Sequence, residues 1–272
     1  VSYTYLSQGS EEVQSPSLDH ISFHIPKGQC VVLCGKSGCG KTTLLRIING
    51  LACHFYQGRL EGDISVSGMV PASASLPELA RVVGSVFQNP RTQFFHTDTT
   101  GELAFQLENQ NMPREQMRRR LDQVVTELGL ESLMERSIFA LSGGEKQQIA
   151  CGSVYASMPQ VVVLDEPSSN LDLESIRKLR GLLETMKASG VTILVSEHRL
   201  WYLHGLADRY LLLESGKLRG DLTPEQMTAL DPQTRQALGL RAVDRWQLFS
   251  LCPQARPKEW MEPGLELRSL FC

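Results

Sequence analysis

The sequence lacks long apolar runs. Those in its 272 residues are short, such as Val161–Leu164 and Tyr210–Leu213, whereas a helix needs about 18–20 such residues to cross a bilayer. Any role at a membrane must therefore depend on a partner. The chain also lacks an excess of one charge, because 27 basic and 30 acidic residues leave a net charge of −3. Nothing in this balance demands a nucleic-acid partner.

Paired cysteines are missing as well. The cysteines show no metal-ligand spacing and follow no secretory signal, so reduced thiols in the cytosol are the simplest interpretation; they stand at positions 30, 34, 39, 53, 151, 252 and 272. We find no low-complexity tract and no internal repeat of about 20–50 residues. The length suits one large α/β domain or two small ones.

Short apolar segments in the first third predict alternating strands and helices. Ile21, Phe23 and Ile25 alternate with polar residues, which is typical of a half-buried strand, and 31–33 follow as a short buried strand. Apolar residues at helical spacing predict a helix over 41–48. Further short β segments are expected between about 58 and 88.

The pattern is helical from about 100 to 150 and then returns to α/β alternation. A helix that ends at Gly129 is expected to bury one face, formed by Leu121, Val124, Val125 and Leu128. The runs 161–164 and 191–195 predict buried strands, joined by a helix from about 173 to 187. That arrangement is the crossover that a parallel sheet requires.

A glycine-rich loop stands between the predicted strand at 31–33 and the predicted helix at 41–48. It satisfies the pattern G-x-x-x-x-G-K-[ST], in which backbone N–H groups hold phosphates, the lysine reaches the β- and γ-phosphates and the hydroxyl can bind Mg²⁺. The alternative is a glycine turn that matches by chance, and Cys39 is more simply a small filler than a redox switch. The residues expected at the nucleotide are Gly35, Lys36, Ser37, Gly38, Cys39, Gly40, Lys41, Thr42 and Thr43.

Two carboxylates follow the predicted strand 161–164. Asp165 suits a contact with Mg²⁺. Glu166, one residue further and expected on the other side of the strand, suits a base that orients the attacking water. A pair of solvated charges at a strand end is the alternative.

A second glycine motif, Leu141–Gln148, begins another predicted helix. Ser142 is expected to cap that helix, and the N–H groups of Gly143 and Gly144 predict a second anion site, to which Glu145 also belongs. One nucleotide rarely needs two γ-phosphate sites in one chain. We therefore expect this loop to close over a nucleotide held by another domain, although a simple loop cap is the alternative.

Together these motifs resemble those of the ATP-binding cassette (ABC) ATPases, and the resemblance covers residues 1–220. Ser169–Asp172 is similar to the family's D-loop, His198 to its switch histidine, and Gln88 to its Q-loop glutamine. The resemblance implies an α/β P-loop NTPase core with an antiparallel β subdomain and a helical signature subdomain over about 95–155. It also implies ATP and Mg²⁺ as cofactors, with Asp172 near the nucleotide.

The resemblance assigns roles to individual residues. It places catalysis on Glu166, His198, Gln88 and Lys41, and it gives Gln88 a place at the metal together with Thr42 and Asp165. Adenine is expected to stack on an aromatic residue near the amino terminus. Tyr5 is preferred to Tyr3 because the family pattern is aromatic-x-Tyr, and a core or surface tyrosine is the alternative for either.

Part of the sequence is similar to the ATPase subunits of energy-coupling factor (ECF) transporters, which import vitamins and metal ions. The similarity lies in Val86–Phe95, Glu102–Phe105 and Leu107–Asn109. A group of arginines could face an acidic element of a partner, although a solvated helix face is the better prediction; it comprises Arg114, Arg118, Arg119 and Arg120.

The resemblance implies that two such domains pair head to tail around ATP. The expected partners are a second ABC ATPase domain and a transmembrane transporter subunit, which would hold the protein at the cytoplasmic face of the membrane, and no nucleic acid is expected. Two alternatives stay open. One is a soluble ABC ATPase that acts on ribosomes or DNA, and the other is a nucleotide-binding regulatory module without turnover.

We expect one ABC domain at 1–220, followed by a C-terminal appendage or interdomain linker at 221–272. The chain begins at Val1 without methionine and stops after the strand-like segment 265–271, so both ends look cut from a longer protein. Residues 264–272 resemble the start of a second cassette. The hypothesis is therefore that this chain is the amino-terminal half of a tandem two-cassette protein.

Overall fold

The computed structural model describes residues 1–6, 15–241 and 243. A six-stranded sheet has the order β4-β5-β6-β2-β7-β8, parallel except for the antiparallel pair β7-β8. A separate antiparallel pair joins β1 to β3. The strands are β1 (Ser2–Tyr5), β2 (Cys30–Cys34), β3 (Gly58–Glu61), β4 (Val83–Val86), β5 (Val161–Asp165), β6 (Thr192–Ser196), β7 (Arg209–Glu214) and β8 (Lys217–Leu222).

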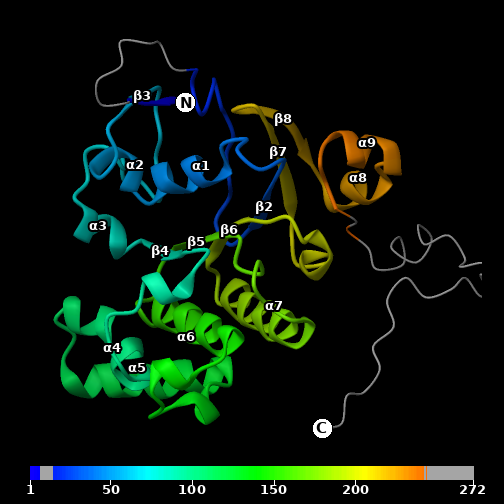
Figure 1. Ribbon diagram of the computed structural model, residues 1–272. Coiled ribbons are helices and arrows are strands. Elements are labelled where there is room, and N and C mark those ends of the chain that lie inside the picture. The colour runs from blue at the N-terminus through cyan, green and yellow to red at the C-terminus, as the bar shows by residue number, and fades with distance from the viewer. Residues whose placement is uncertain (7–14, 242, 244–272) are drawn as a thin grey trace, which may run out of the picture.

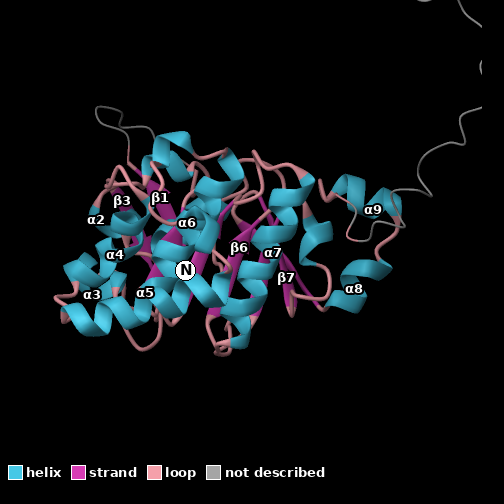
Figure 2. Ribbon diagram, turned by 90° about the horizontal axis from the view of Figure 1, so that it is seen from below, coloured by secondary structure: helices cyan, strands magenta, loops and turns pink. Residues whose placement is uncertain are grey.

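Helices cover both faces of the large sheet (Figure 1). Viewed from below, α6 and α7 lie in front of the strands (Figure 2). The α-helices are α1 (Lys41–Ile48), α2 (Leu51–His54), α3 (Leu76–Ala80), α4 (Thr99–Asn109), α5 (Arg114–Leu128), α6 (Gly143–Ala156), α7 (Leu173–Ala188), α8 (Pro224–Ala229) and α9 (Pro232–Ala237). Short 3₁₀ turns occur at Pro90–Thr92, Glu131–Leu133, Ile138–Ala140 and Leu200–Leu203.

The side chains of β2 divide the core into two halves. Val31 and Leu33 pack with α1 and Tyr3, whereas Cys30, Val32 and Cys34 pack with α6 and α7. This follows from the period of two along a strand, which sends successive side chains to opposite faces of the sheet. The helices α1 and α6 therefore lie on opposite faces.

Several predicted elements are confirmed. The helix α1 has the predicted bounds, α7 runs one residue beyond the predicted end, and α5 ends at Gly129 in the left-handed conformation typical of a helix C-terminus. The small pair β1-β3 is the antiparallel β part of the fold.

Two expectations need correction, and one helix was not expected. Residues 21–25 alternate in burial as predicted but form no strand, and the short helix α3 was not foreseen. The proposed boundary at 220 falls inside β8, which pairs with β7 as far as Leu222. The helix α8 then packs against β7 and β8, and its Met227 is fully buried. The segment 264–272 lies outside the described residues.

No helix among the described residues combines the length and the apolar character needed to cross a membrane.

Candidate functional site

The glycine-rich loop Gly35–Thr42 leads from β2 directly into α1. Lys41, the first residue of α1, is only 4% exposed, and its Nζ donates to the carbonyl oxygens of Gly35 at 2.9 Å and Lys36 at 3.1 Å. The backbone of the loop thus curves around the ammonium group of Lys41. Because both of these partners are neutral carbonyls, the buried cation is well placed to accept an anionic phosphate as a further partner.

The amino end of α1 has no side-chain cap. Its N-cap, Gly40, has a φ of +105° and makes no side-chain cap hydrogen bond, and the first turn contains no acidic residue. A Cβ at Gly40 would lie 2.6 Å from Leu18 Cδ2 and 2.7 Å from the Ser17 carbonyl oxygen. The first N–H groups and the positive end of the helix dipole therefore remain available to an anion.

The carboxyl end of β5 meets the start of α1. The Thr42 hydroxyl donates to Asp165 Oδ1 at 3.1 Å. Burial raises the pKa of the Asp165 carboxyl above its ordinary value, and the hydrogen bond from Thr42 opposes this rise. Two oxygen atoms that could both bind a metal ion are thus adjacent, although the residues that carry them are more than a hundred positions apart in the sequence.

Glu166 is held between two side chains from other segments. Its Oε1 lies 3.1 Å from His198 Nε2, and its Oε2 accepts a hydrogen bond from Gln88 Nε2 at 3.2 Å. The residue follows the last residue of β5 and has a φ of +44°, so its direction comes from a tight turn rather than from strand alternation. The alternation expected along the strand therefore does not set its direction. A strained conformation of this kind is typical of functional sites.

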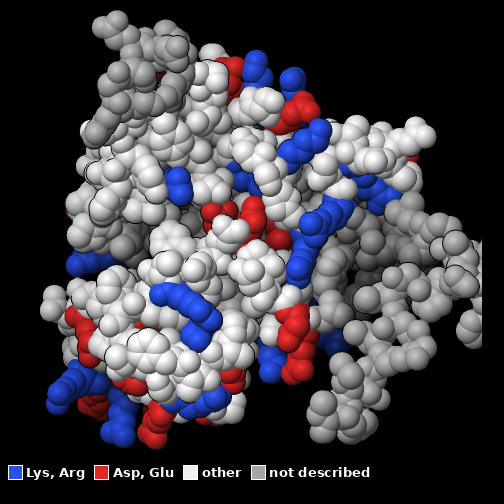
Figure 3. All heavy atoms as spheres, viewed as in Figure 1, with Lys and Arg blue, Asp and Glu red and all other residues white. Residues whose placement is uncertain are grey.

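These groups line or adjoin one groove of about 550 Å³. Its walls include Thr42, Asp165 and Gln88, together with Arg46 and Tyr56. Acidic side chains gather over the part of the sheet around β5 and β6, with lysine and arginine side chains on either side (Figure 3). Carboxylate, hydroxyl and amide oxygens are the ligands that Mg²⁺ prefers, so this donor set fits a magnesium ion.

The two amino-terminal tyrosines have different environments. Tyr3 is fully buried, and its hydroxyl donates to the Ala52 carbonyl oxygen at 2.9 Å. Tyr5 is half-buried, and its hydroxyl lies 3.4 Å from Thr43 Oγ1, close to the glycine-rich loop. Tyr3 is therefore a core residue, and only Tyr5 has an accessible ring beside the loop.

The second glycine motif begins α6 and is closed by its own side chains. Ser142 Oγ accepts from the Glu145 N–H at 3.3 Å, and Glu145 Oε2 accepts from the Ser142 N–H at 2.7 Å, which is a capping box. Hydrogen bonds to its carboxylate from the Ser142 N–H and the Ser142 hydroxyl, with a further one from Arg136, lower the pKa of Glu145 to about 2. Gly144 is required by packing, since a Cβ there would lie 2.0 Å from Ser175 Oγ.

The structure does not bring Ser142–Glu145 into the groove that contains Thr42 and Asp165. The residues that line that groove come from α1, α2, β4, β5 and the segments that follow α1, α2 and β4, whereas α6 belongs to the opposite half of the core. Gly143 instead lines a neighbouring pocket that it shares with Gln88. Asp172 also acts locally, because its Oδ1 caps α7 by accepting from the Ser175 N–H at 2.7 Å. A contact of either group with nucleotide stays a prediction.

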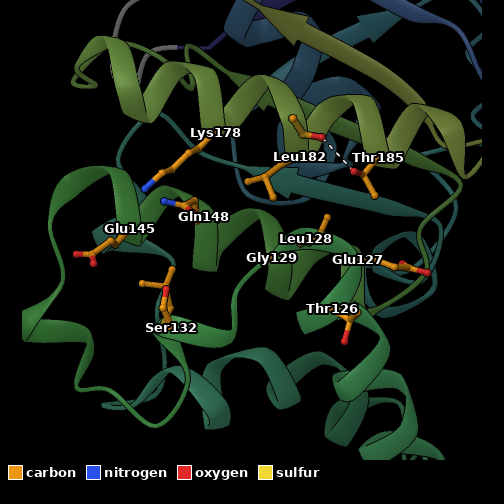
Figure 4. A pocket seen from close by; sticks show the side chains of 12 residues that line it. Thr126, Glu127, Leu128, Gly129, Ser132, Glu145, Gln148, Lys178, Leu182 and Thr185 are labelled. Carbon is orange, nitrogen blue, oxygen red and sulfur yellow. Dashed lines mark hydrogen bonds between the residues drawn. The ribbon is translucent and has the colours of Figure 1, made fainter.

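A pocket of about 490 Å³ between α5, α6 and α7 is separate from this site (Figure 4). Glu145 and Lys178 lie at one end of it, and Glu127 and Thr126 lie at the other. Its lining contains no residue of the glycine-rich loop or of the end of β5. It is therefore not the nucleotide site.

The arginines of α5 are not one solvated face. Arg119 pairs with Glu115 on the helix surface, as predicted. Arg120 instead donates to the carbonyl oxygens of Tyr155 at 2.7 Å and Ala156 at 3.2 Å, at the end of α6. Its role is to cap α6, so the expectation of a solvated face is wrong for this residue.

Glu197 was missed as a site residue, although the string Ser196–His198 contains it. It is 2% exposed and accepts hydrogen bonds from the N–H groups of His198 and Arg199. The signal in the sequence is a carboxylate that directly follows a buried strand and precedes the histidine.

The residues 18–169, more than half of the chain, match the model of the ABC transporter family. The chain therefore belongs to this family and is an ABC-type ATPase domain with a mixed α/β P-loop core. Two relatives from Treponema denticola, both named as ABC transporter ATP-binding proteins, are similar to it. One is 49% identical over 89% of this chain and 48% of its own length, and the other is 40% identical over 91% and 49%. The chain spans about half the length of these curated relatives.

Two solved structures share the fold. One is cbiO1 from Clostridium perfringens, described as part of the ABC transporter complex cbiONQ, with a TM-score of 0.68 and 24% identity over 80% of this chain and 86% of its own. The other is an ATP-binding cassette solved as a dimer in a post-hydrolysis state with ADP and Pi. Its TM-score is 0.69, with 23% identity over 82% of this chain and 96% of its own.

Proposed function

We propose that this chain binds ATP at Gly35–Thr42 and hydrolyses it with Mg²⁺. The observation that carries this proposal is the position of Glu166, whose carboxylate lies 3.1 Å from His198 Nε2 and 3.2 Å from Gln88 Nε2 beside the Asp165–Thr42 pair. A carboxylate oriented by a histidine and an amide next to a phosphate loop is suited to position and activate a water molecule.

The other residues of the site supply binding and electrostatic stabilisation. Lys41 and the uncapped start of α1 would hold the β- and γ-phosphates, and Tyr5 would stack on the adenine. Thr42, Asp165 and Gln88 would hold Mg²⁺, which neutralises charge on the phosphates when bound. In such a site preorganised charge is the largest contribution to the rate.

The loop Ser142–Glu145 is proposed to act on a nucleotide held by a second cassette. Two observations support this: α1 and α6 lie on opposite faces of the sheet, and a cassette of the same fold was solved as a dimer with ADP and Pi. The relatives from Treponema denticola are about twice as long as the matched region. This supports a partner cassette within one longer protein.

The work done by this hydrolysis is proposed to be transport. The chain would act at the cytoplasmic face of a membrane through a transmembrane partner, and the ECF-type importers are the class that the sequence resembles. The similarity in fold to cbiO1, which is described as part of a transporter complex, supports this class. Vitamins or metal ions would be the cargo.

The test is ATP turnover by the Glu166→Gln variant in the presence of Mg²⁺. We expect turnover to fall by about 100-fold or more, because the amide cannot accept a proton, while ATP binding is retained. Glu108→Gln, an exposed substitution on α4, is the matched control. Unchanged turnover in Glu166→Gln would refute the role of this carboxylate.

A further inference from the structure

Glu197 is a buried carboxylate between β6 and His198. With 2% of its surface exposed, it accepts four hydrogen bonds from protein groups. Burial of an ionised carboxylate is costly unless every lone pair finds a donor. Four donors converging on one side chain therefore show that this part of the fold is organised around it.

One oxygen of Glu197 fixes the segment that carries His198. Its Oε1 accepts from the His198 N–H at 2.8 Å and from the Arg199 N–H at 3.1 Å. Both donors belong to the backbone, so the contact orients the main chain on either side of the histidine Cα. The imidazole reaches Glu166 from this fixed position.

The other oxygen reaches the turn that follows Glu166. Its Oε2 accepts from the Ser168 N–H at 3.3 Å and from the Tyr202 hydroxyl at 2.9 Å. Ser168 is fully buried and stands two residues after Glu166. A single carboxylate thus joins the backbone beside Glu166 to the backbone beside His198.

Arg199 makes a second link between the same two segments. Its Nη1 donates to the Leu171 carbonyl oxygen at 3.0 Å, within the stretch that resembles the D-loop. Glu197 and Arg199 stand on either side of His198, and both contact the chain between Ser168 and Leu171. Two contacts at different points restrain a segment more than one contact does.

We propose that Glu197 and Arg199 are positioning residues that fix the geometry of the His198–Glu166 pair by clamping the segment 168–171. The inference rests on the proposed function, because the pair matters only if Glu166 and His198 act on the attacking water. Neither residue touches the reacting atoms. Their effect should therefore appear in the chemical step rather than in the binding of ATP.

The test compares Glu197→Gln with Arg199→Leu and Arg199→Lys by steady-state ATP turnover of the full protein. A glutamine keeps the size of Glu197 but turns an N–H group toward donors that need an acceptor. We expect Glu197→Gln to lower kcat about tenfold with KM for ATP within about twofold of the unaltered value.

The arginine variants distinguish loss of the contact with Leu171 from a general loss of folding. Arg199→Leu removes the donor to Leu171 and should lower kcat about threefold, whereas Arg199→Lys, which can still donate, should restore most of it. Arg177→Leu, an exposed arginine on α7, is the matched control and should behave as the unaltered protein. This series decides the question even if Glu197→Gln does not fold.

The outcomes distinguish the two claims. If the unaltered protein shows no Mg²⁺-dependent turnover, the proposed function fails and removes the basis of the inference. If the unaltered protein is active but kcat is unchanged in Glu197→Gln and Arg199→Leu, the inference alone is overturned. It is also overturned if the variants raise KM at constant kcat, or if Arg199→Lys is as impaired as Arg199→Leu.

Discussion

Two helices of this domain begin at glycine motifs, and the two starts are built in opposite ways. The start of α1 has a left-handed Gly40 as its cap, no side-chain cap hydrogen bond and the buried Lys41 as its first residue. The start of α6 is closed by Ser142 and Glu145, whose carboxylate lies on the positive end of the helix dipole. Similar glycine content therefore does not give similar sites.

The difference shows which start can hold a phosphate without help. At α1 the helix dipole and a lysine act together on an incoming anion. At α6 the charge of Glu145 already compensates the dipole, and Arg136 pairs with that carboxylate at 2.8 Å. The start of α6 is thus suited to a secondary contact with a nucleotide that another domain holds, as the proposed pairing requires.

The largest expected difference, in both stability and affinity for ATP, is between the variants Gly40→Ala and Gly143→Ala. Gly40→Ala places a Cβ within 2.7 Å of two neighbouring atoms in a left-handed conformation, so it should cost about 2 kcal/mol or more of stability and most of the affinity for ATP. A Cβ at Gly143 would meet nothing closer than 4.0 Å. Gly143→Ala should change stability by about 0.5 kcal/mol at most.

Urea unfolding and ATP titration of both variants measure this contrast. Equal losses of stability would show that the two starts are not built differently, and the comparison would then fail.

A smaller effect is expected from the cap of α6. Glu145→Ala should lower the free energy of unfolding by about 1 kcal/mol near neutral pH. Because the folded pKa of Glu145 is lowered from 4.5 to about 2, its contribution is complete above about pH 4.5 and is lost as the pH falls toward 2. The difference in free energy of unfolding between Glu145→Ala and the unaltered protein should therefore fall to zero as the pH is lowered from about 4.5 to about 2.

The cap of α8 provides the control for this pH dependence. Its capping box uses the neutral Thr223 and Gln226, so Gln226→Ala should destabilise the protein by a similar amount at every pH. Urea unfolding between pH 7 and pH 2 makes both measurements. A pH-independent loss in Glu145→Ala would contradict the assignment of the cap to the ionised carboxylate.

Local parts of the fold could be predicted from the sequence. The helix α1 has its predicted bounds because glycines and a regular apolar spacing define it within a few residues. The strands β2, β5 and β6 are predicted by short apolar, β-branched runs bounded by polar residues. Residues 21–25 show the limit, since their alternation is correct but a strand also needs a neighbouring strand, which no local pattern specifies.

Contacts between distant segments were predicted only through the resemblance to a family. Nothing near Glu166 in the sequence indicates that Gln88 and His198 lie within 3.2 Å of it. The network of Glu197 is not predicted, because its link to Ser168 joins segments 29 residues apart and its local donors, His198, Arg199 and Tyr202, follow no capping pattern in the sequence. Arg120 was assigned to solvent because its partners stand at the end of another helix.

If the start of α1 holds the nucleotide alone and the start of α6 acts only on a nucleotide held by another cassette, one variant should separate the two roles. Gly143→Arg is the variant for this experiment, because Gly143 stands at the exposed start of α6 and a Cβ there would meet nothing closer than the Asn170 carbonyl oxygen at 4.0 Å. Two quantities are measured. One is the affinity for ATP of the chain at a concentration too low for pairing, and the other is the Mg²⁺-dependent ATP turnover of the full protein. We expect an affinity within about twofold of the unaltered value and turnover reduced by about tenfold or more. If the affinity of the unpaired chain for ATP fell as much as turnover, the start of α6 would also act on the chain's own nucleotide, and the division of roles between the two helix starts would be refuted.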